Sequence, residues 1–279
     1  MTSKFKMAAV AAAAAFATTL GWASSAGAAD TNPAFKRVTS GSTATVDHSA
    51  WDKLLKAYVV AGADGLNRVV YTKLKAEHAA LKGYVAALQK VDPATLDKAE
   101  QFAFWVNLYN AKTIDVVLDK YPVKSIKDVN LGGGLKTLIG GGPWQAKIMK
   151  VSGVELSLDD IENTILRPIY GDPRVHYTVN CASVGCPNLS SDAYTGTKLE
   201  AMLEAGAKAF INSPRGVLIE GDKITASSIY DWFRADFGGS EKAVFDHWRK
   251  YATPELAAKF DGIGKIASHN YDWALADAK

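Results

Sequence analysis

The sequence has few cysteines and little net charge. It contains only two cysteines in 279 residues, Cys181 and Cys186, and 32 Lys and Arg stand against 29 Asp and Glu. The near-neutral balance gives no electrostatic case for a nucleic acid or an anionic membrane surface as partner. The length is sufficient for a substantial hydrophobic core.

A long apolar segment is also missing. The main apolar run, residues 7–20, is shorter than the ~20 residues needed to span a bilayer. It follows Lys4 and Lys6 and precedes a run of small residues ending at Ala28, a pattern typical of a cleavable secretory signal peptide. We therefore predict a signal peptide over residues 1–28 and a periplasmic or secreted protein, with no stable membrane insertion after cleavage. Loss of the two lysines lowers the formal net charge from +3 to +1.

The remaining chain contains no internal repeat, and helical periodicity dominates it. Helices are expected near residues 47–59, 73–90, 94–120, 157–167, 197–212, 227–237, 241–251 and 254–260. Strands are expected in two hairpins, 144–156 and 217–226, and at residues 175–180 and 265–271. This order predicts an α+β fold, with one helix-rich domain over residues 48–279, a small and mainly antiparallel sheet, and a flexible lead-in over residues 29–47.

Six glycines lie within residues 132–142. Such a stretch is conformationally loose, and it suits either a surface loop or a mobile lid or anion cradle. No P-loop or Rossmann spacing accompanies the glycines, so the surface loop is favoured.

Residues 172–187 form the segment richest in reactive side chains, because they include His176, both cysteines, Arg174 and Asn180. A His–Cys pair is the minimum for thiol nucleophile chemistry, in which the imidazole accepts the thiol proton. If residues 175–180 form a strand, however, His176 and Cys181 face opposite sides and meet only where the strand ends or bulges. Cys186 lies on the following loop and is freer to move. Arg174 and Asn180 are assigned to substrate binding.

Three explanations of the cysteine pair remain open. In an oxidising compartment Cys181 and Cys186 can form a disulfide, which is either a structural staple or, if strained, a redox element. One of them can instead be a catalytic thiol. Zinc is the weakest alternative, because the spacing lacks a CxxC knuckle and no fourth ligand is evident. We predict no metal and no cofactor.

Two other segments contain candidate site residues. The helix around residues 102–111 is apolar on nearly all sides and should be central and buried, and it carries Asn107 and Asn110 on one face. Buried amides need partners, so these two either tie the helix to a loop or line a substrate pocket. Glu162 lies at the edge of the apolar face of the predicted helix 157–167. It is either solvated or placed to orient His176.

Three motifs stand out in order along the chain: residues 104–111, 160–167 and 172–189. Together with residues 228–237 and 271–275 they resemble the DUF547 family of uncharacterised proteins. The resemblance spans roughly residues 69–275.

The resemblance also implies a distant similarity to papain- and transglutaminase-like folds, in which a central helix packs on an antiparallel sheet and a thiol pairs with a strand histidine. This chain departs from that pattern, because both cysteines follow His176 and the central helix offers Asn107 and Asn110 in place of a cysteine. Either the site was rebuilt around Glu162, His176 and a cysteine, or thiol catalysis was lost.

The leading functional prediction is a thiol-dependent hydrolase or an acyl or peptidyl transferase. His176 is the expected base, Cys181 the nucleophile with Cys186 as the second choice, and Glu162 the orienting group. Asn107, Asn110, Arg174 and Asn180 are expected to bind a small-molecule or peptide substrate. The alternatives are a non-catalytic binding module with a structural disulfide and a thiol–disulfide redox protein. The sequence does not indicate the oligomeric state.

Overall fold

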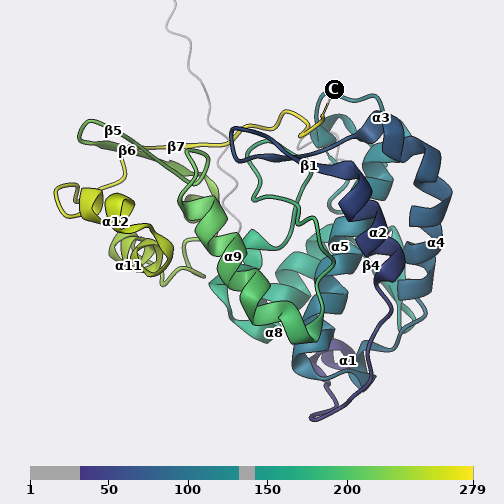
Figure 1. Cartoon of the computed structure of the whole chain (residues 1–279). Helices are drawn as coiled ribbons and strands as arrows, with labels where there is room; N and C mark the ends of the chain where they lie inside the picture. Colours follow the sequence, from purple (N-terminus) through teal and green to yellow (C-terminus); the bar gives the residue numbers. More distant parts are fainter. Residues whose placement is uncertain (1–31, 132–141, 279) are drawn as a thin grey trace, which may run out of the picture.

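The computed structural model describes residues 32–131 and 142–278 (Figure 1). The predicted signal peptide, residues 1–28, and the glycine-rich stretch up to Gly141 lie outside the described residues. Within the described part of the chain, no helix is long and apolar enough to cross a membrane. The α+β, helix-rich fold class is confirmed.

The central element is helix α5, Lys98–Lys120, which is buried on nearly all sides as predicted. It begins later than residue 94, because residues Pro93–Thr95 form a separate 3-10 turn, η2, capped by Asp92. Asp97 then starts the helix by accepting a hydrogen bond from the Glu100 amide, 2.8 Å long. The chain uses two successive N-caps where the sequence suggested one.

Several short elements surround α5 and share its hydrophobic core (Figure 1). They are α1 (Pro33–Lys36), α2 (Ser49–Tyr58), α3 (Tyr71–Leu74), η1 (Lys75–Glu77), α4 (His78–Leu88) and η3 (Ile126–Asp128). Phe35 of α1 is 1% exposed, and its ring centroid lies 5.1 Å from that of Trp105. The described part of the predicted lead-in therefore lies against the domain.

The strands form three small sheets. Two are antiparallel hairpins, β1 (Val59–Ala61) with β2 (Asn67–Val69) and β3 (Met149–Val151) with β4 (Val154–Leu156). The third sheet joins β5 (Val217–Glu220), β6 (Lys223–Ser227) and β7 (Ser268–Asn270), and β7 runs parallel to β6. The strands are thus mainly antiparallel, as predicted, and both predicted hairpins are present.

A second hydrophobic core consists of Tyr177 and of buried residues from Ala207 onward. It is built from α9 (Leu199–Ile211), α10 (Ile229–Trp232), α11 (Glu241–Tyr251) and α12 (Pro254–Phe260), together with β5 and β6. The short η6 (Gly196–Lys198) that precedes α9 lies against α5. Figure 1 shows α11, α12 and the β5–β7 sheet on the side away from α4.

A continuous but irregular helix follows β4. It consists of α7 (Leu158–Asp160), the π-helical segment η4 (Ile161–Leu166) and α8 (Arg167–Tyr170). A capping box begins it at the start of the predicted helix 157–167: Ser157 and Asp160 bind each other's backbone amides. π-Helical turns are rare and often occur at functional sites. This one contains Glu162.

The predicted strand at residues 175–180 is wrong. Asp172 accepts a hydrogen bond from the Arg174 amide, 2.8 Å long, and begins a 3-10 helix, η5 (Pro173–Tyr177), with Pro173 in its first turn. Val175, His176 and Tyr177 are all buried. Because this segment lacks the alternation of a strand, the two-sided argument that separated His176 from Cys181 does not apply.

After β7 the chain crosses back over the molecule as an extended segment, residues 271–278, which we call the C-terminal strap (yellow in Figure 1). The amides of Val184 and Gly185 donate to carbonyls of the strap, at 2.8 and 2.7 Å. At its far end the Ala278 amide donates to the Val69 carbonyl of β2, at 2.9 Å. The strap therefore ties the loop that carries the cysteines to the first core.

Candidate functional site

The two cysteines meet on one buried loop. Their sulfur atoms lie 2.6 Å apart, and both residues are free thiols in the structure. Cys181 is 9% exposed and Cys186 is 4% exposed. Of the two, Cys181 is therefore the one nearer to solvent.

The loop is held by its own polar groups. Asn180 accepts a hydrogen bond from the Ala182 amide at 2.8 Å and donates one to the Pro187 carbonyl at 2.7 Å. Ala182 has a left-handed backbone with φ of 64°, which is uncommon for a residue other than glycine and which clusters at functional sites. Arg215 donates to the carbonyl oxygens of Val184 and Cys186. Asn180 thus shapes the cysteine loop, and its role in substrate binding stays a prediction.

Hydroxyl groups surround the sulfurs. The Tyr271 hydroxyl lies 3.0 Å from the Cys181 sulfur and 3.1 Å from the Cys186 sulfur. The Ser183 hydroxyl lies 3.1 Å from the Cys181 sulfur. The backbone amide of Cys181 donates to the Cys186 sulfur at 2.9 Å. Every one of these groups can donate a hydrogen to a thiolate.

These contacts separate the acidities of the two thiols. Burial acts to raise the pKa of Cys181, but hydrogen bonds from Cys186, Ser183 and Tyr271 outweigh it and lower the pKa to about 7. Burial raises the pKa of Cys186 well above its usual value, and the adjacent Cys181 raises it further. Cys181 is therefore the thiol that ionises first.

His176 belongs to a second, neighbouring cluster. Its Nε2 lies 2.7 Å from Oδ2 of Asp236, and its Nδ1 lies 3.9 Å from Oε1 of Glu162. Its ring stacks on Phe233, with centroids 4.3 Å apart. Burial lowers the pKa of His176, although Asp236 acts in the opposite direction.

Arg167 completes this cluster through Asp236. Its guanidinium makes two hydrogen bonds to the Asp236 carboxylate, of 2.5 and 3.1 Å. Burial alone would raise the pKa of Asp236, but the hydrogen bonds from His176 and Arg167 hold it well below its usual range. The carboxylate is therefore ionised and fixes the orientation of the imidazole.

The structure does not join His176 to a sulfur. Within the described part of the chain, the polar contacts of the His176 ring are to the carboxylates of Asp236 and Glu162. The orienting carboxylate at hydrogen-bond distance is Asp236, whereas Glu162 was predicted for that role. In the described part of the chain, no contact between Cys181 and His176 would allow a direct proton transfer from the thiol to the imidazole.

Glu162 interacts electrostatically with both clusters, with Cys181 in one and with His176 in the other. The Tyr109 hydroxyl donates to its Oε2 at 3.2 Å, and its other oxygen faces His176. Burial raises the pKa of Glu162 to about 7, Arg167 opposes the shift, and charge on Cys181 adds to it. A carboxyl group with such a pKa can accept or release a proton near neutral pH.

The elevated pKa predicts a pH-dependent effect on stability. Well below pH 4.5, the ordinary pKa of the group, Glu162 is protonated in both the folded and the unfolded chain and its titration has no effect on the free energy of unfolding. As the pH rises toward 7 the unfolded chain loses this proton first, so the folded state is progressively destabilised, by roughly 3 kcal/mol above pH 7. Glu162→Gln removes this penalty. In urea unfolding from pH 4.5 to 8, the variant should gain that amount over the wild type as the pH rises, and parallel curves would contradict the shift.

Asn107 and Asn110 act as backbone tethers. Asn107 exchanges hydrogen bonds with the carbonyl and amide of Tyr194, at 2.8 and 3.0 Å. Asn110 donates to the Thr178 carbonyl and accepts from the Asn180 amide, both at 2.8 Å. These contacts are those of the structural alternative, in which the two amides tie the helix to a loop. The role of Asn107 and Asn110 in substrate binding stays a prediction.

Arg174 is also engaged within the protein. Its guanidinium binds the carboxylates of Asp172 and Glu200, at 2.6 and 2.9 Å. The hydrogen bonds to Asp172 and Glu200 outweigh burial and raise its pKa. It contributes to the start of η5, and no contact in the described part of the chain brings it to the thiols.

A possible metal-binding group and a pocket lie elsewhere in the described part of the chain. His78, Asp115 and Asp119 lie close together, but Lys112 and Lys82 each bind one of these carboxylates at 2.7 Å, so the group is an ion-pair network.

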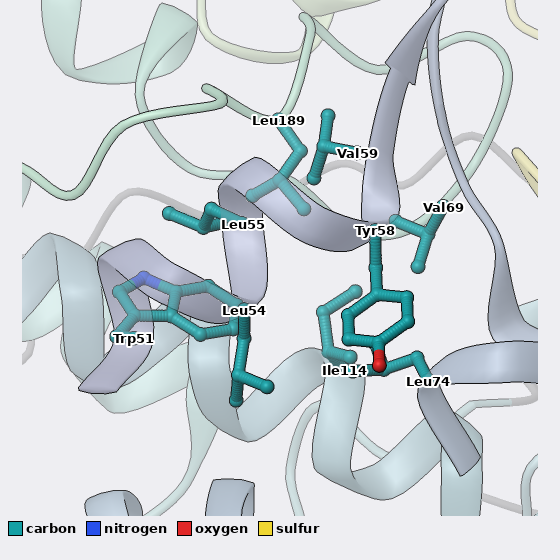
Figure 2. Close-up of a pocket in the computed structure, with 9 residues that line it drawn as sticks. All are labelled: Trp51, Leu54, Leu55, Tyr58, Val59, Val69, Leu74, Ile114 and Leu189. Carbon is teal, nitrogen blue, oxygen red and sulfur yellow. The ribbon is translucent and has the colours of Figure 1, made fainter. Parts of the chain in front are cut away.

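Figure 2 shows a pocket between α2, β2 and α5. Its volume is about 10 Å³ and its nine lining residues, Trp51, Leu54, Leu55, Tyr58, Val59, Val69, Leu74, Ile114 and Leu189, are almost wholly apolar. It is a packing void at the lower limit for one water.

Sequence reasoning missed three groups of this site. Tyr271, Ser183 and Asp236 were given no role of their own. Tyr271 lies 90 positions from Cys181 and Asp236 lies 60 positions from His176, so no local spacing connects them. The available signal was that both residues fall within the two tail motifs, 228–237 and 271–275.

The comparisons agree with the motifs. Residues 93–211 match the family model described as protein of unknown function, DUF547. The match includes both cysteines, His176 and Glu162, whereas Asp236 and Tyr271 lie beyond its end. No curated protein and no solved structure matches the chain. The similarity to papain- and transglutaminase-like folds therefore has no support.

Proposed function

We propose that the chain carries out thiol–disulfide exchange, with Cys181 as the attacking thiol and Cys186 as the resolving thiol. The observation that carries the proposal is the contact between two buried thiols whose pKa values are shifted in opposite directions. A thiol with a pKa near the ambient pH is the most effective attacking group in such exchange. Export by the signal peptide that the sequence predicts over residues 1–28 would put this reaction in an oxidising compartment.

The reaction has two steps. The Cys181 thiolate attacks one sulfur of a partner disulfide, which forms a mixed disulfide and releases the other partner sulfur as a thiolate. Cys186 then loses its proton and attacks the Cys181 sulfur, which forms the Cys181–Cys186 disulfide and releases the second partner thiol. The partner is reduced by two electrons and the cysteine pair is oxidised, and the reverse sequence oxidises a partner dithiol.

A second candidate is the predicted hydrolase or acyl transferase, with Cys181 as nucleophile. The observation in its favour is Glu162, whose pKa of about 7 matches that of Cys181 and whose charge interacts with it. In this mechanism Glu162 replaces the predicted His176 as the base, and His176 with Asp236 positions Glu162. Within the described part of the chain, the Glu162 carboxyl group interacts with Cys181 through charge and has no direct contact with the sulfur. The neighbouring Cys186 counts against it, because oxidation of the pair would block an acyl intermediate. A binding module in which the pair is a fixed disulfide is the third alternative.

The stoichiometry of exchange tests the leading proposal. The reduced chain is mixed with glutathione disulfide, and the products are followed by mass spectrometry and a thiol assay. We expect the chain to lose two hydrogen atoms and to release two glutathione molecules per disulfide formed. Cys181→Ala should release almost none. A thioester with an activated ester substrate, without any glutathione release, would favour the acyl transferase, and a pair that cannot be reduced beforehand would favour the binding module.

A further inference from the structure

The Tyr271 hydroxyl occupies an unusual position with respect to both cysteines. It is almost equally distant from the two sulfurs, 3.0 and 3.1 Å. Ser183 differs, since its hydroxyl contacts the Cys181 sulfur at 3.1 Å and donates to the Tyr271 oxygen at 3.1 Å. The Tyr271 hydroxyl is thus shared by both thiols. The single Ser183 hydrogen can go to the Cys181 sulfur or to the Tyr271 oxygen, and of the two sulfurs its hydroxyl contacts that of Cys181.

The position of the Tyr271 ring is fixed by packing. Its centroid lies 4.6 Å from that of Trp273 and 4.9 Å from that of Trp232. The backbone of the C-terminal strap approaches Gly185 so closely that an added Cβ would lie 2.7 Å from the Asp272 nitrogen. Burial raises the pKa of Tyr271 well above its usual value, and the neighbouring cysteines add to the shift. The group therefore stays protonated and remains a hydrogen-bond donor.

We propose that the Tyr271 hydroxyl stabilises both thiolates of the exchange in turn, whereas Ser183 stabilises only that of Cys181. The inference rests on the proposed function and adds a division of roles within it. Tyr271 touches both reacting sulfurs and is in this sense a catalytic residue, supplied by the C-terminal strap.

The negative charge moves from one sulfur to the other during the exchange. In the first step the charge is on Cys181, where the hydrogens of Ser183, Tyr271 and Cys186 are within reach. After attack Cys181 is part of a neutral mixed disulfide, and the charge must appear on Cys186. The donors at that sulfur are the Tyr271 hydroxyl and the Cys181 backbone amide. Rotation of the Tyr271 hydroxyl about its C–O bond turns the hydrogen from one sulfur to the other without displacing a heavy atom.

The two steps can be observed separately with a nitroaromatic disulfide whose released thiolates absorb light. Rapid mixing with the reduced chain gives a first phase for attack by Cys181 and a second for resolution by Cys186. In Tyr271→Phe we expect both phases at pH 7 to slow about fivefold to tenfold, with their pH profiles displaced upward by about one unit. In Ser183→Ala only the first phase should slow. Tyr170→Phe, which removes a hydroxyl bound to Gln101, is the control and should change neither phase.

The outcomes separate this inference from the proposed function. A wild-type chain that releases no thiolate overturns both. A wild type with two phases, together with a Tyr271→Phe chain whose second phase is unchanged, overturns the role of Tyr271 alone. Equal slowing of both phases in Ser183→Ala overturns the division of roles. If Tyr271→Phe fails to fold, fluorotyrosine at position 271 provides a stronger donor and should accelerate resolution, and an unchanged rate would contradict the inference.

Discussion

Cys186→Ala is expected to arrest the exchange at the mixed disulfide. The variant keeps the attacking thiol, the Ser183 hydroxyl and the Tyr271 hydroxyl at the Cys181 sulfur. It lacks the thiol that lies 2.6 Å away and would displace the partner. The adduct on Cys181 should therefore accumulate to nearly one per chain with glutathione disulfide, and attack should be slower than in the wild type because one donor to the thiolate is lost.

The complementary variant makes this prediction specific. In Cys181→Ala the remaining thiol has a pKa well above the usual value because it is buried, so it is mostly protonated at pH 7. Adduct formation should fall to background. Peptide mapping of the adduct by mass spectrometry measures both results. Equal adduct formation on the two single variants would mean that the environment of the pair does not select the attacking thiol.

Asn110→Ala is expected to have the largest effect on stability. The substitution leaves the Thr178 carbonyl and the Asn180 amide buried without the partners that they have in the wild type. Each such group costs about 1–3 kcal/mol, so the free energy of unfolding should fall by roughly 2–6 kcal/mol in urea titration. The loop that begins at Asn180 should also loosen, and alkylation of Cys181 should lose its selectivity over Cys186.

Asn107→Ala is the matched control, because it removes the same kind of tether from the same helix. Its partner is Tyr194, away from the cysteine loop. The loss of stability should be similar, and the selectivity between the two thiols should be retained. An Asn110→Ala chain of unchanged stability would indicate that the amide serves a ligand, as the sequence prediction had it.

The elements that the sequence predicted well are those with local signals. Ser157 and Asp160 form the capping box that their spacing indicated, and Gly221 turns the β5–β6 hairpin with a positive φ of 62°. The burial of α5 followed from apolar residues on all its faces. In each case the residues that determine the element are within a few positions of one another.

The candidate site was predicted only in part, and the reason is physical. Alternation of apolar and polar residues over 175–180 resembled a strand, but Pro173 and the Asp172 cap favour a 3-10 helix, and tertiary packing buries His176 with its neighbours. The loop that brings the two cysteines together contains Ala182 in a left-handed backbone conformation. An alanine in the sequence does not predict that conformation. Tyr271 and Asp236 reach the site through long-range packing.

A redox titration of the wild-type chain shows whether the Cys181–Cys186 pair is redox-active. The chain is equilibrated in buffers of reduced and oxidised dithiothreitol or glutathione, and the state of the pair is read by alkylation and mass spectrometry. If the chain carries out thiol–disulfide exchange, we expect one reversible two-electron transition between the dithiol and the Cys181–Cys186 disulfide. A pair that remains oxidised under strongly reducing conditions, or one that never forms the disulfide, would contradict it.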